Sequence, residues 1–404
     1  MDTVGKKPEG PKPPDKKTRS KSKAVLAIFY VGYLAAILAG VEVIVRLVVA
    51  RPKDPNLRRV LVDYHHLARG ETNNFRFVAD SELPYRLKAD FEFRSPEGGK
   101  VTHHNTVGFR DVEDFPPKTE AALRIICLGG STTYGVSVID NRATYPAALE
   151  RFLNGEHQPQ GWDRVEVFNL GVGGYTSREV LTTFQRHGLP LQPDVVLIQS
   201  GLNDVAPRLY PDFDCDYRHF RKSLTLPAQS FLARQAYHSR LFLTLGWKLN
   251  LIEPFTLQAR TQYPMPSADE AAANFDANGT DCLYENLTTA VELAKNAGAR
   301  VWMLSQVYLN DPDFESPDPD QRNLERLYRR GLLEHNKVIR DVCMSIDTGL
   351  VDFENVMPRR RRFFTDPVHM SEEGNEMKAK LIAKSISSAL SRMPNPSRGS
   401  HSEP

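Results

Sequence analysis

Continuous apolar runs alternate with amphipathic stretches along the chain from residue 124 onward. Five short runs consist almost only of apolar residues, and they cover residues 125–128, 165–169, 195–199, 301–304 and 350–353. Runs without strict alternation are typical of strands in a parallel sheet that is covered on both faces. Helical periodicity fills the intervals between them, at residues 145–153, 177–187, 283–295, 320–345 and 372–392. This alternation predicts an α/β fold, a three-layer α/β/α sandwich with right-handed crossovers.

Two segments depart from this rhythm. Short alternations such as Phe75-Arg76-Phe77, set among Pro and Gly turns, predict a small β-rich lead-in over residues 50–121. Residues 205–281 interrupt the alternation of strands and helices, and we interpret them as an insertion in a domain that covers residues 122–392. The last residues, 393–404, form a loose, disordered tail in this interpretation.

An uncharged apolar run occupies residues 24–41. Continued to residue 49, it reaches the ~20 residues that a helix needs to cross a bilayer core of ~30 Å. Glu42 and Arg46 interrupt the extension, but their spacing lets them pair on one helix face or extend toward the interface. We predict one transmembrane helix over residues 24–49. A cleaved signal peptide is the alternative, supported by the small residues Ala36 and Ala39, whereas the long preceding tail and the length of the run favour an anchor.

Charge is concentrated at the N-terminus. Residues 1–23 contain eight Lys/Arg and three Asp/Glu, a net charge of +5, so the remaining residues sum to −3 within the total of +2. The tail is expected to be disordered, and a nucleic-acid-binding body is excluded. Five basic residues follow the apolar run in residues 51–69. The larger number before it predicts that the tail is cytoplasmic and the globular part extracytoplasmic.

Four cysteines, at positions 127, 215, 282 and 343, are too few and too scattered for a disulfide-framed miniprotein, and no Cys-x-x-Cys pair signals a metal. Cys215 and Cys282 lie at the two ends of the insertion. They form either a disulfide, which an oxidising compartment permits, or two unpaired loop thiols. Cys127 and Cys343 fall in a strand and a helix, where we expect buried free thiols.

Residues able to do chemistry follow the predicted strands, where sites form in open parallel sheets. Gly129-Gly130-Ser131-Thr132 follows the first strand, and a Gly-rich stretch ending at Gly174 follows the second. Gly201-Leu202-Asn203-Asp204 follows the third strand, and Asp366-Pro367-Val368-His369 lies beyond the fifth. Each segment alone is explained by a tight turn, a helix cap or ordinary loop composition. Their common place at strand ends indicates a single site.

Together these segments resemble the SGNH hydrolases, the GDSL-like lipase/acylhydrolase family, over about residues 122–391. The resemblance implies a flavodoxin-like sandwich and ester hydrolysis by a serine mechanism without a metal or other cofactor. It assigns Ser131 as the nucleophile, His369 and Asp366 as the rest of the triad, and Gly174 and Asn203 to the oxyanion site. Gly130 replaces the Asp of the family's best-known motif. Residues 105–110, Asn-Thr-Val-Gly-Phe-Arg, resemble a segment common in membrane-anchored members.

The residue chemistry agrees with that assignment. A serine hydroxyl is a weak nucleophile until a base takes its proton, and His369 has a carboxylate three residues before it to orient the ring. The N–H groups of Ser131 and Gly174 and the Asn203 amide can stabilise an oxyanion. The Gly-x-Ser-x-Gly elbow of α/β-hydrolases is not matched, because Thr133 stands in place of the second glycine.

We therefore expect a serine esterase that hydrolyses carboxylic (O-acyl) esters. A membrane-tethered, extracytoplasmic site favours acyl groups on cell-envelope glycans or lipids as substrate. An O-acetyltransferase of envelope glycans, with a sugar hydroxyl in place of water, is one alternative, although no acyl-donor transport domain is visible. A non-catalytic envelope-binding protein that retains the fold is another, since fold alone does not establish activity.

Overall fold

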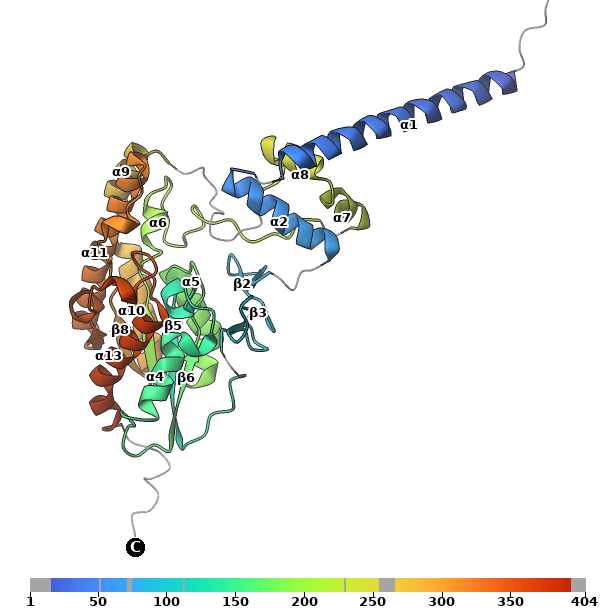
Figure 1. Cartoon of the computed structure of the whole chain (residues 1–404). Coiled ribbons are helices and arrows are strands. Elements are labelled where there is room, and N and C mark those ends of the chain that lie inside the picture. The colour runs from blue at the N-terminus through green and yellow to red at the C-terminus, as the bar shows by residue number, and fades with distance from the viewer. Residues whose placement is uncertain are drawn as a thin grey trace, which may run out of the picture. The chain divides into compact units, whose positions relative to one another are not determined.

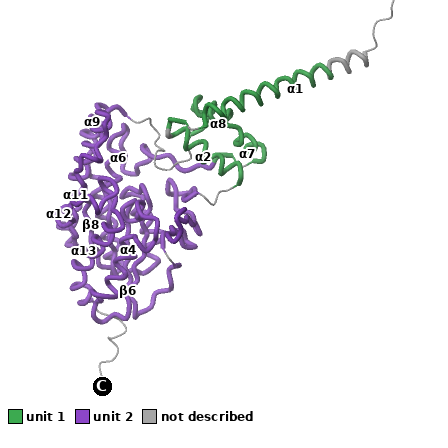
Figure 2. The backbone as a smooth tube through the Cα atoms, viewed as in Figure 1, with its two compact units in different colours: residues 1–72, 227–255 green, residues 73–226, 256–404 purple. Residues whose placement is uncertain are grey.

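The computed structural model describes residues 16–50, 52–70, 75–111, 113–228, 230–253 and 266–393. The chain divides into two compact units, which Figure 2 colours differently. Unit 1 combines residues 1–72 with residues 227–255, and unit 2 combines residues 73–226 with residues 256–404. The predicted tails lie outside the described residues, except for residues 16–23 and Met393.

Unit 2 is built on a five-stranded parallel sheet with the strand order β6-β5-β7-β8-β9 (Figure 1). The strands are β5 (Ala122–Gly129), β6 (Arg164–Asn169), β7 (Val195–Gln199), β8 (Arg300–Leu304) and β9 (Gly349–Val351). The predicted α/β fold with a parallel sheet is confirmed. The chain passes from β5 to β6 on one side and then to β7 on the other, so the strand order reverses at β5. Loops that follow β5 and β7 therefore meet at a topological switch point, where ligands bind in open α/β sheets.

Helices cover both faces of the sheet. On one face α4 (Tyr145–Leu153) packs against α13 (Glu372–Leu390), and their apolar side chains form a buried cluster with alternate residues of β5, β6 and β7. On the other face lie α5 (Ser177–Thr183), α10 (Asp281–Asn296) and α11 (Pro319–Ile346). All eight residues of β5 are buried because both faces are covered. The shorter helices of unit 2 are α3 (Ser131–Tyr134), α6 (Val205–Arg208), α9 (Ala268–Ala277) and α12 (Phe353–Val356).

Small antiparallel pairs precede the sheet, as predicted. The first joins β1 (Phe77–Val78) to β2 (Arg86–Leu87), and the second joins β3 (Glu92–Arg94) to β4 (Val101–His103). These pairs belong to unit 2.

Unit 1 is helical and contains α1 (Lys16–Val48), α2 (Pro55–Arg69), α7 (Phe231–Tyr237) and α8 (Arg240–Lys248). α1 begins eight residues before the predicted membrane segment, because no proline occurs between Pro14 and Pro52 and basic residues are good helix formers. Its residues Val25–Val48 are apolar and long enough to cross a membrane.

α2 lies in the stretch for which short strands were predicted, and that part of the expectation was wrong. The Asp54 side chain accepts hydrogen bonds from the N–H groups of Asn56 and Leu57, and Gly70 ends the helix at a φ of 72°. An N-cap Asp followed by Pro, and a Gly beyond the last turn, are helix signals that the sequence contained. The buried residues at helical spacing are Leu57, Val60, Tyr64 and Leu67.

A disulfide joins Cys215 to Cys282, with the two Cα atoms 5.0 Å apart. Cys127 and Cys343 are free and buried, as predicted. The bridge connects the two ends of the excursion by which the chain leaves unit 2 for unit 1 and returns, so it closes a loop between residues 67 positions apart. A bridge of this kind is typical of proteins that fold in an oxidising compartment.

Candidate active site

Ser131 is held at the end of β5 by two glycines that permit close approach. A Cβ atom at Gly129 would lie 2.4 Å from the carbonyl oxygen of Gln199. A Cβ atom at Gly130 would lie 2.5 Å from Nδ2 of Asn203. Both distances are shorter than real Cβ contacts, so these positions require glycine unless their neighbours move.

Ser131, His369 and Asp366 form a continuous hydrogen-bonded chain. The Ser131 Oγ lies 2.7 Å from His369 Nε2, and His369 Nδ1 lies 2.6 Å from Asp366 Oδ2. The other carboxylate oxygen of Asp366 accepts hydrogen bonds from the N–H groups of Val368 (2.9 Å) and His369 (2.8 Å). One side chain thus fixes both the ring and the backbone of the histidine.

The same contacts determine the charge of Asp366. Partial burial alone would raise its pKa, but the hydrogen bonds from His369 and Val368 and the attraction of the His369 ring hold the pKa below its ordinary value. The carboxylate is therefore ionised at neutral pH. An ionised carboxylate keeps the proton of a neutral imidazole on Nδ1 and leaves Nε2 free to accept the serine proton.

Two of the three predicted oxyanion groups line one small cavity. Ser131 and Asn203 lie on its wall together with Gly130 and Tyr175. The Asn203 amide donates one N–H to the carbonyl of Tyr175 at 2.8 Å, which orients it. Gly174 does not line that cavity, although the next residue does. Gly174 has a φ of 84°, a conformation that favours glycine.

Side chains that the sequence analysis did not single out clamp the Gly174 loop. The Arg221 guanidinium donates to the Gly174 carbonyl and, at 2.8 Å, to the hydroxyl of Tyr85. The Tyr85 hydroxyl donates to the carbonyl of Gly173 at 2.8 Å. Tyr85 belongs to the β-rich lead-in, so that segment takes part in positioning the loop.

Residues 105–110 were noted in the sequence only for their resemblance to a segment of membrane-anchored family members. In the structure, Arg110 of this segment holds the loop that follows Ser131. The buried Arg110 guanidinium donates to four backbone carbonyls of that loop and to the Asn141 side chain at 3.0 Å. The four acceptors are Tyr134 (3.2 Å), Gly135 (2.5 Å), Val138 (2.8 Å) and Ile139 (2.9 Å). Burial lowers the pKa of Arg110 to about 10, so it remains charged at neutral pH. In the sequence, Arg110 is only an arginine next to a turn, and this pattern does not predict which groups it contacts.

A buried polar chain begins at Thr132, the residue after Ser131. The Gln199 side-chain carbonyl accepts hydrogen bonds from the Thr132 hydroxyl (3.1 Å) and from Lys378 Nζ. Lys378 is fully buried, with Nζ 3.8 Å from the centre of the Tyr145 ring. Burial lowers the pKa of Lys378 to about 7. Lys378 lies on α13 and was not singled out in the sequence analysis.

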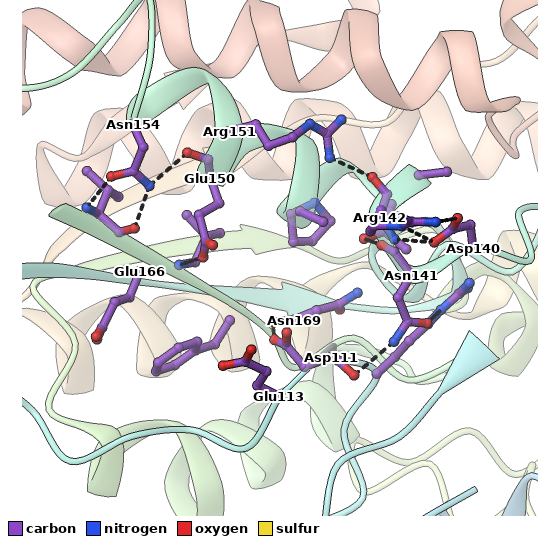
Figure 3. A pocket seen from close by; sticks show the side chains of 18 of the residues that line it. Asp111, Glu113, Asp140, Asn141, Arg142, Glu150, Arg151, Asn154, Glu166 and Asn169 are labelled. Atoms are coloured by element: carbon purple, nitrogen blue, oxygen red, sulfur yellow. Dashed lines mark hydrogen bonds and ion pairs between the residues drawn. The ribbon is translucent and has the colours of Figure 1, made fainter. Parts of the chain in front are cut away.

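A larger cavity, of about 920 Å³, lies along the outer edge of β6 and has neither Ser131 nor His369 on its wall (Figure 3). Its polar side chains act as acceptors for N–H groups of this edge strand. The pairs are Val165 with Asn154 (2.8 Å), Val167 with Glu150 (2.7 Å) and Asn169 with Asp111 (3.4 Å). These side chains accept the hydrogen bonds that a neighbouring strand would otherwise accept. The edge of the sheet is therefore covered at these N–H groups. Within the described ranges, no three His, Cys, Asp or Glu side chains are grouped so as to hold a metal ion.

Comparison with known proteins agrees with the resemblance seen in the sequence. Residues 127–377 match the GDSL-like Lipase/Acylhydrolase family. A lipase/acylhydrolase from Enterococcus faecalis is 18% identical, over 66% of this chain and 96% of its own, with a TM-score of 0.40. An acetyl xylan esterase from Geobacillus stearothermophilus is 15% identical, over 66% of this chain and 97% of its own, with a TM-score of 0.38. No curated protein matches the chain.

Proposed function

The chain belongs to the GDSL-like lipase/acylhydrolase family of ester hydrolases, and from that premise we propose that it hydrolyses carboxylic (O-acyl) esters with Ser131 as nucleophile. In this proposal His369 acts as base and then as acid, and Asp366 orients it. The observation that carries the proposal is the hydrogen-bonded chain from Ser131 Oγ through both nitrogens of His369 to Asp366. A nucleophile within hydrogen-bond reach of a base, itself oriented by a third group, is the arrangement that acyl transfer requires.

The proposed reaction has two halves. Ser131 Oγ attacks the ester carbonyl as its proton passes to His369 Nε2, and the N–H groups of Ser131 and Gly174 and the amide of Asn203 stabilise the oxyanion. Collapse expels the alcohol, which takes the proton from His369 and leaves an acyl-serine. Water then gives a proton to His369 and attacks the acyl group. Release of the carboxylic acid returns the proton to Ser131.

Replacement of Ser131 by Ala tests this proposal. We expect Ser131→Ala to lose both the hydrolysis of short acyl esters and labelling by a fluorophosphonate, which reacts only with an activated serine. Ser137→Ala is the matched control, because Ser137 lies in the same loop outside the proposed machinery. Retention of more than a few per cent of activity in pure Ser131→Ala protein would contradict the assignment. Labelling of wild type without turnover of any ester would favour a transferase.

We propose further that α1 is a membrane anchor and that the globular part lies outside the cytoplasm. Support comes from the length and apolar character of residues Val25–Val48 and from the excess of basic residues before them. The Cys215–Cys282 disulfide supports the same side of the membrane. Acyl groups on cell-envelope glycans or lipids are then the proposed substrates. The domain boundaries predicted from the sequence, with a hydrolase domain over residues 122–392 and an insertion at residues 205–281, belong to the same proposal.

A further inference from the structure

Exposed apolar side chains gather on the two short helices that the insertion contributes to unit 1. We call them the apolar foot, and its members are Phe231, Leu232, Phe242, Leu245, Leu249 and Leu251, each 44–78% exposed. Three of them, Phe242, Leu245 and Leu249, follow the i, i+3, i+7 spacing that places side chains on one helix face. The opposite face of α8 is packed, since Leu243 and Gly246 are buried. Large apolar side chains grouped on one exposed face indicate a surface that something apolar covers.

The foot is joined to the last turns of α1. The Glu42 carboxylate accepts hydrogen bonds from the Ser239 hydroxyl (2.7 Å) and from the N–H groups of Arg240 and Leu241 (both 2.9 Å). It also pairs with Arg46 at 2.7 Å. Glu42 therefore caps the N-terminus of α8, and these contacts fix α8 beside α1 within unit 1 (Figure 2).

The place of Glu42 along α1 gives the level at which α8 begins. Glu42 lies six residues before Val48, the end of the apolar segment, which at 1.5 Å per residue is roughly 9 Å along the helix axis. Val25–Val48 spans 24 residues, or roughly 36 Å, which exceeds a hydrocarbon core of ~30 Å. If α1 spans the bilayer with Val25–Val48 centred on the hydrocarbon core, Glu42 and the first turn of α8 lie roughly 6 Å inside the border between hydrocarbon and headgroups.

A carboxylate at that level is costly unless it is fully hydrogen-bonded. The first turn of α8 offers the free N–H groups that satisfy Glu42, so α8 has to stay beside Glu42 at the same depth in the membrane. Apart from Arg46, the exposed side chains of α1 around Glu42 are apolar, including Val43 and Leu47. The foot thus lies on a helix that contacts α1, whose own exposed surface there is mostly apolar.

The charge of this segment favours the same partner. Residues 227–252 contain three Lys/Arg and no Asp/Glu. Helices with one apolar face and basic flanks lie in the plane of the membrane interface and are attracted by anionic lipids.

We propose that the apolar foot is a second membrane contact, inserted in the lipid interface beside the last turns of α1. This inference rests on the proposed membrane anchor and is independent of the proposed esterase chemistry. It assigns a function to part of the predicted insertion: α7 and α8 lie on the bilayer and brace the helix that crosses it.

Fluorescent probes in the full-length protein test the proposal. Leu245→Cys and Leu249→Cys are each labelled with an NBD maleimide, after confirmation that the buried Cys127 and Cys343 of the wild type take up no label. The proteins are reconstituted in vesicles of phosphatidylcholine and phosphatidylglycerol that carry a nitroxide either near the carbonyl end or near the methyl end of the acyl chain. We expect blue-shifted emission at both positions and loss of most of the intensity with the shallow nitroxide.

Two control positions separate the possible failures. A probe at Leu34→Cys, in the middle of α1, reports the anchor and should respond most to the deep nitroxide. A probe at Glu285→Cys, exposed on α10, should respond to neither. In one outcome the probe at Leu34 is quenched, but the probes at positions 245 and 249 are quenched no more than the probe at Glu285. That outcome would overturn the membrane contact of the foot and leave the proposed anchor standing. Blue-shifted emission at 245 and 249 that no nitroxide quenches would assign the surface to a second copy of the chain and also overturn it. Absence of quenching at Leu34 would overturn both proposals while leaving the esterase test unaffected.

Discussion

Asn203 carries an amide with two N–H groups, and only one of them donates to the Tyr175 carbonyl. Asn203 also lines the small cavity on whose wall Ser131 lies. We expect Asn203→Ala to lower kcat about 10²–10³-fold, the usual cost of one oxyanion donor. In a Ser131→Ala background the same change should add little, because groups that act as a unit are not additive. Steady-state kinetics on a short acyl ester checks both points, with the exposed Asn296→Ala as control.

Lys378 makes the stability of the fold depend on pH. Burial lowers its pKa from the ordinary 10.5 to about 7, so between these values the unfolded chain binds a proton that the folded chain does not. The free energy of unfolding should therefore rise with pH across this window, with a slope of up to ~1.4 kcal/mol per pH unit from this group. The neighbouring Cys127 thiol stays neutral for most of the window, since burial raises its pKa to about 12.

Lys378→Met isolates that effect. The variant removes the penalty for keeping a lysine uncharged in an apolar site, so its advantage over wild type should be largest near pH 7 and shrink toward pH 10. Chemical denaturation across this pH range measures the difference. A difference in free energy of unfolding that does not change with pH would contradict the buried, neutral lysine.

At the level of elements, the turn around Arg110 is tied to the loop that follows α3. A lysine in place of Arg110 would keep the positive charge, but it lacks the planar guanidinium that donates to four carbonyls. We expect Arg110→Met to lower the free energy of unfolding by about 3 kcal/mol or more, because buried acceptors lose their donors, and Arg110→Lys to have a smaller effect. As Arg110 positions the loop without lining the cavity next to Ser131, kcat should fall more than KM changes. Arg392→Lys, exposed after α13, is the control.

The disulfide pins the two ends of the excursion through unit 1. In the chain-entropy model a closed loop of this length contributes roughly 4 kcal/mol, less any strain in the native state. Cys215→Ser/Cys282→Ser should lower the stability of unit 2 by up to that amount, and a reductant should do the same to wild type. The reductant should leave the double variant unchanged, which provides an internal control. A non-reduced digest without a linked peptide pair would contradict the bridge.

At the scale of the whole molecule, the proposed topology places residues 51–404 outside the cytoplasm. Protease added to intact cells or sealed vesicles should digest this part and spare the basic N-terminal tail. The expectation follows from the eight basic residues that precede the apolar run. Protection of the globular part would reverse the topology and remove the support for an envelope substrate.

Much of the fold was predictable because its determinants are local. Short continuous apolar runs between amphipathic stretches are typical of strands in a parallel sheet covered on both faces, and all five were found within three residues of their predicted ends. The short motifs also selected Ser131, Asn203, Asp366 and His369 before any geometry was available. Residues at the carboxyl ends of neighbouring parallel strands converge, so their position in the chain already implied a common site. The disulfide followed from position as one of two alternatives.

Tertiary structure alone decided the contacts between segments that are distant in the chain. Arg110 reads in the sequence as one of many arginines, and only the fold turns it toward four carbonyls of the loop after Ser131. Lys378 lies on an amphipathic helix, where burial depends on which side chains the sheet presents to it. The close approach at position 130 comes from the side chain of Asn203, 73 residues later. Periodicity reports which face of an element is buried, whereas the partner on that face is set by packing between elements.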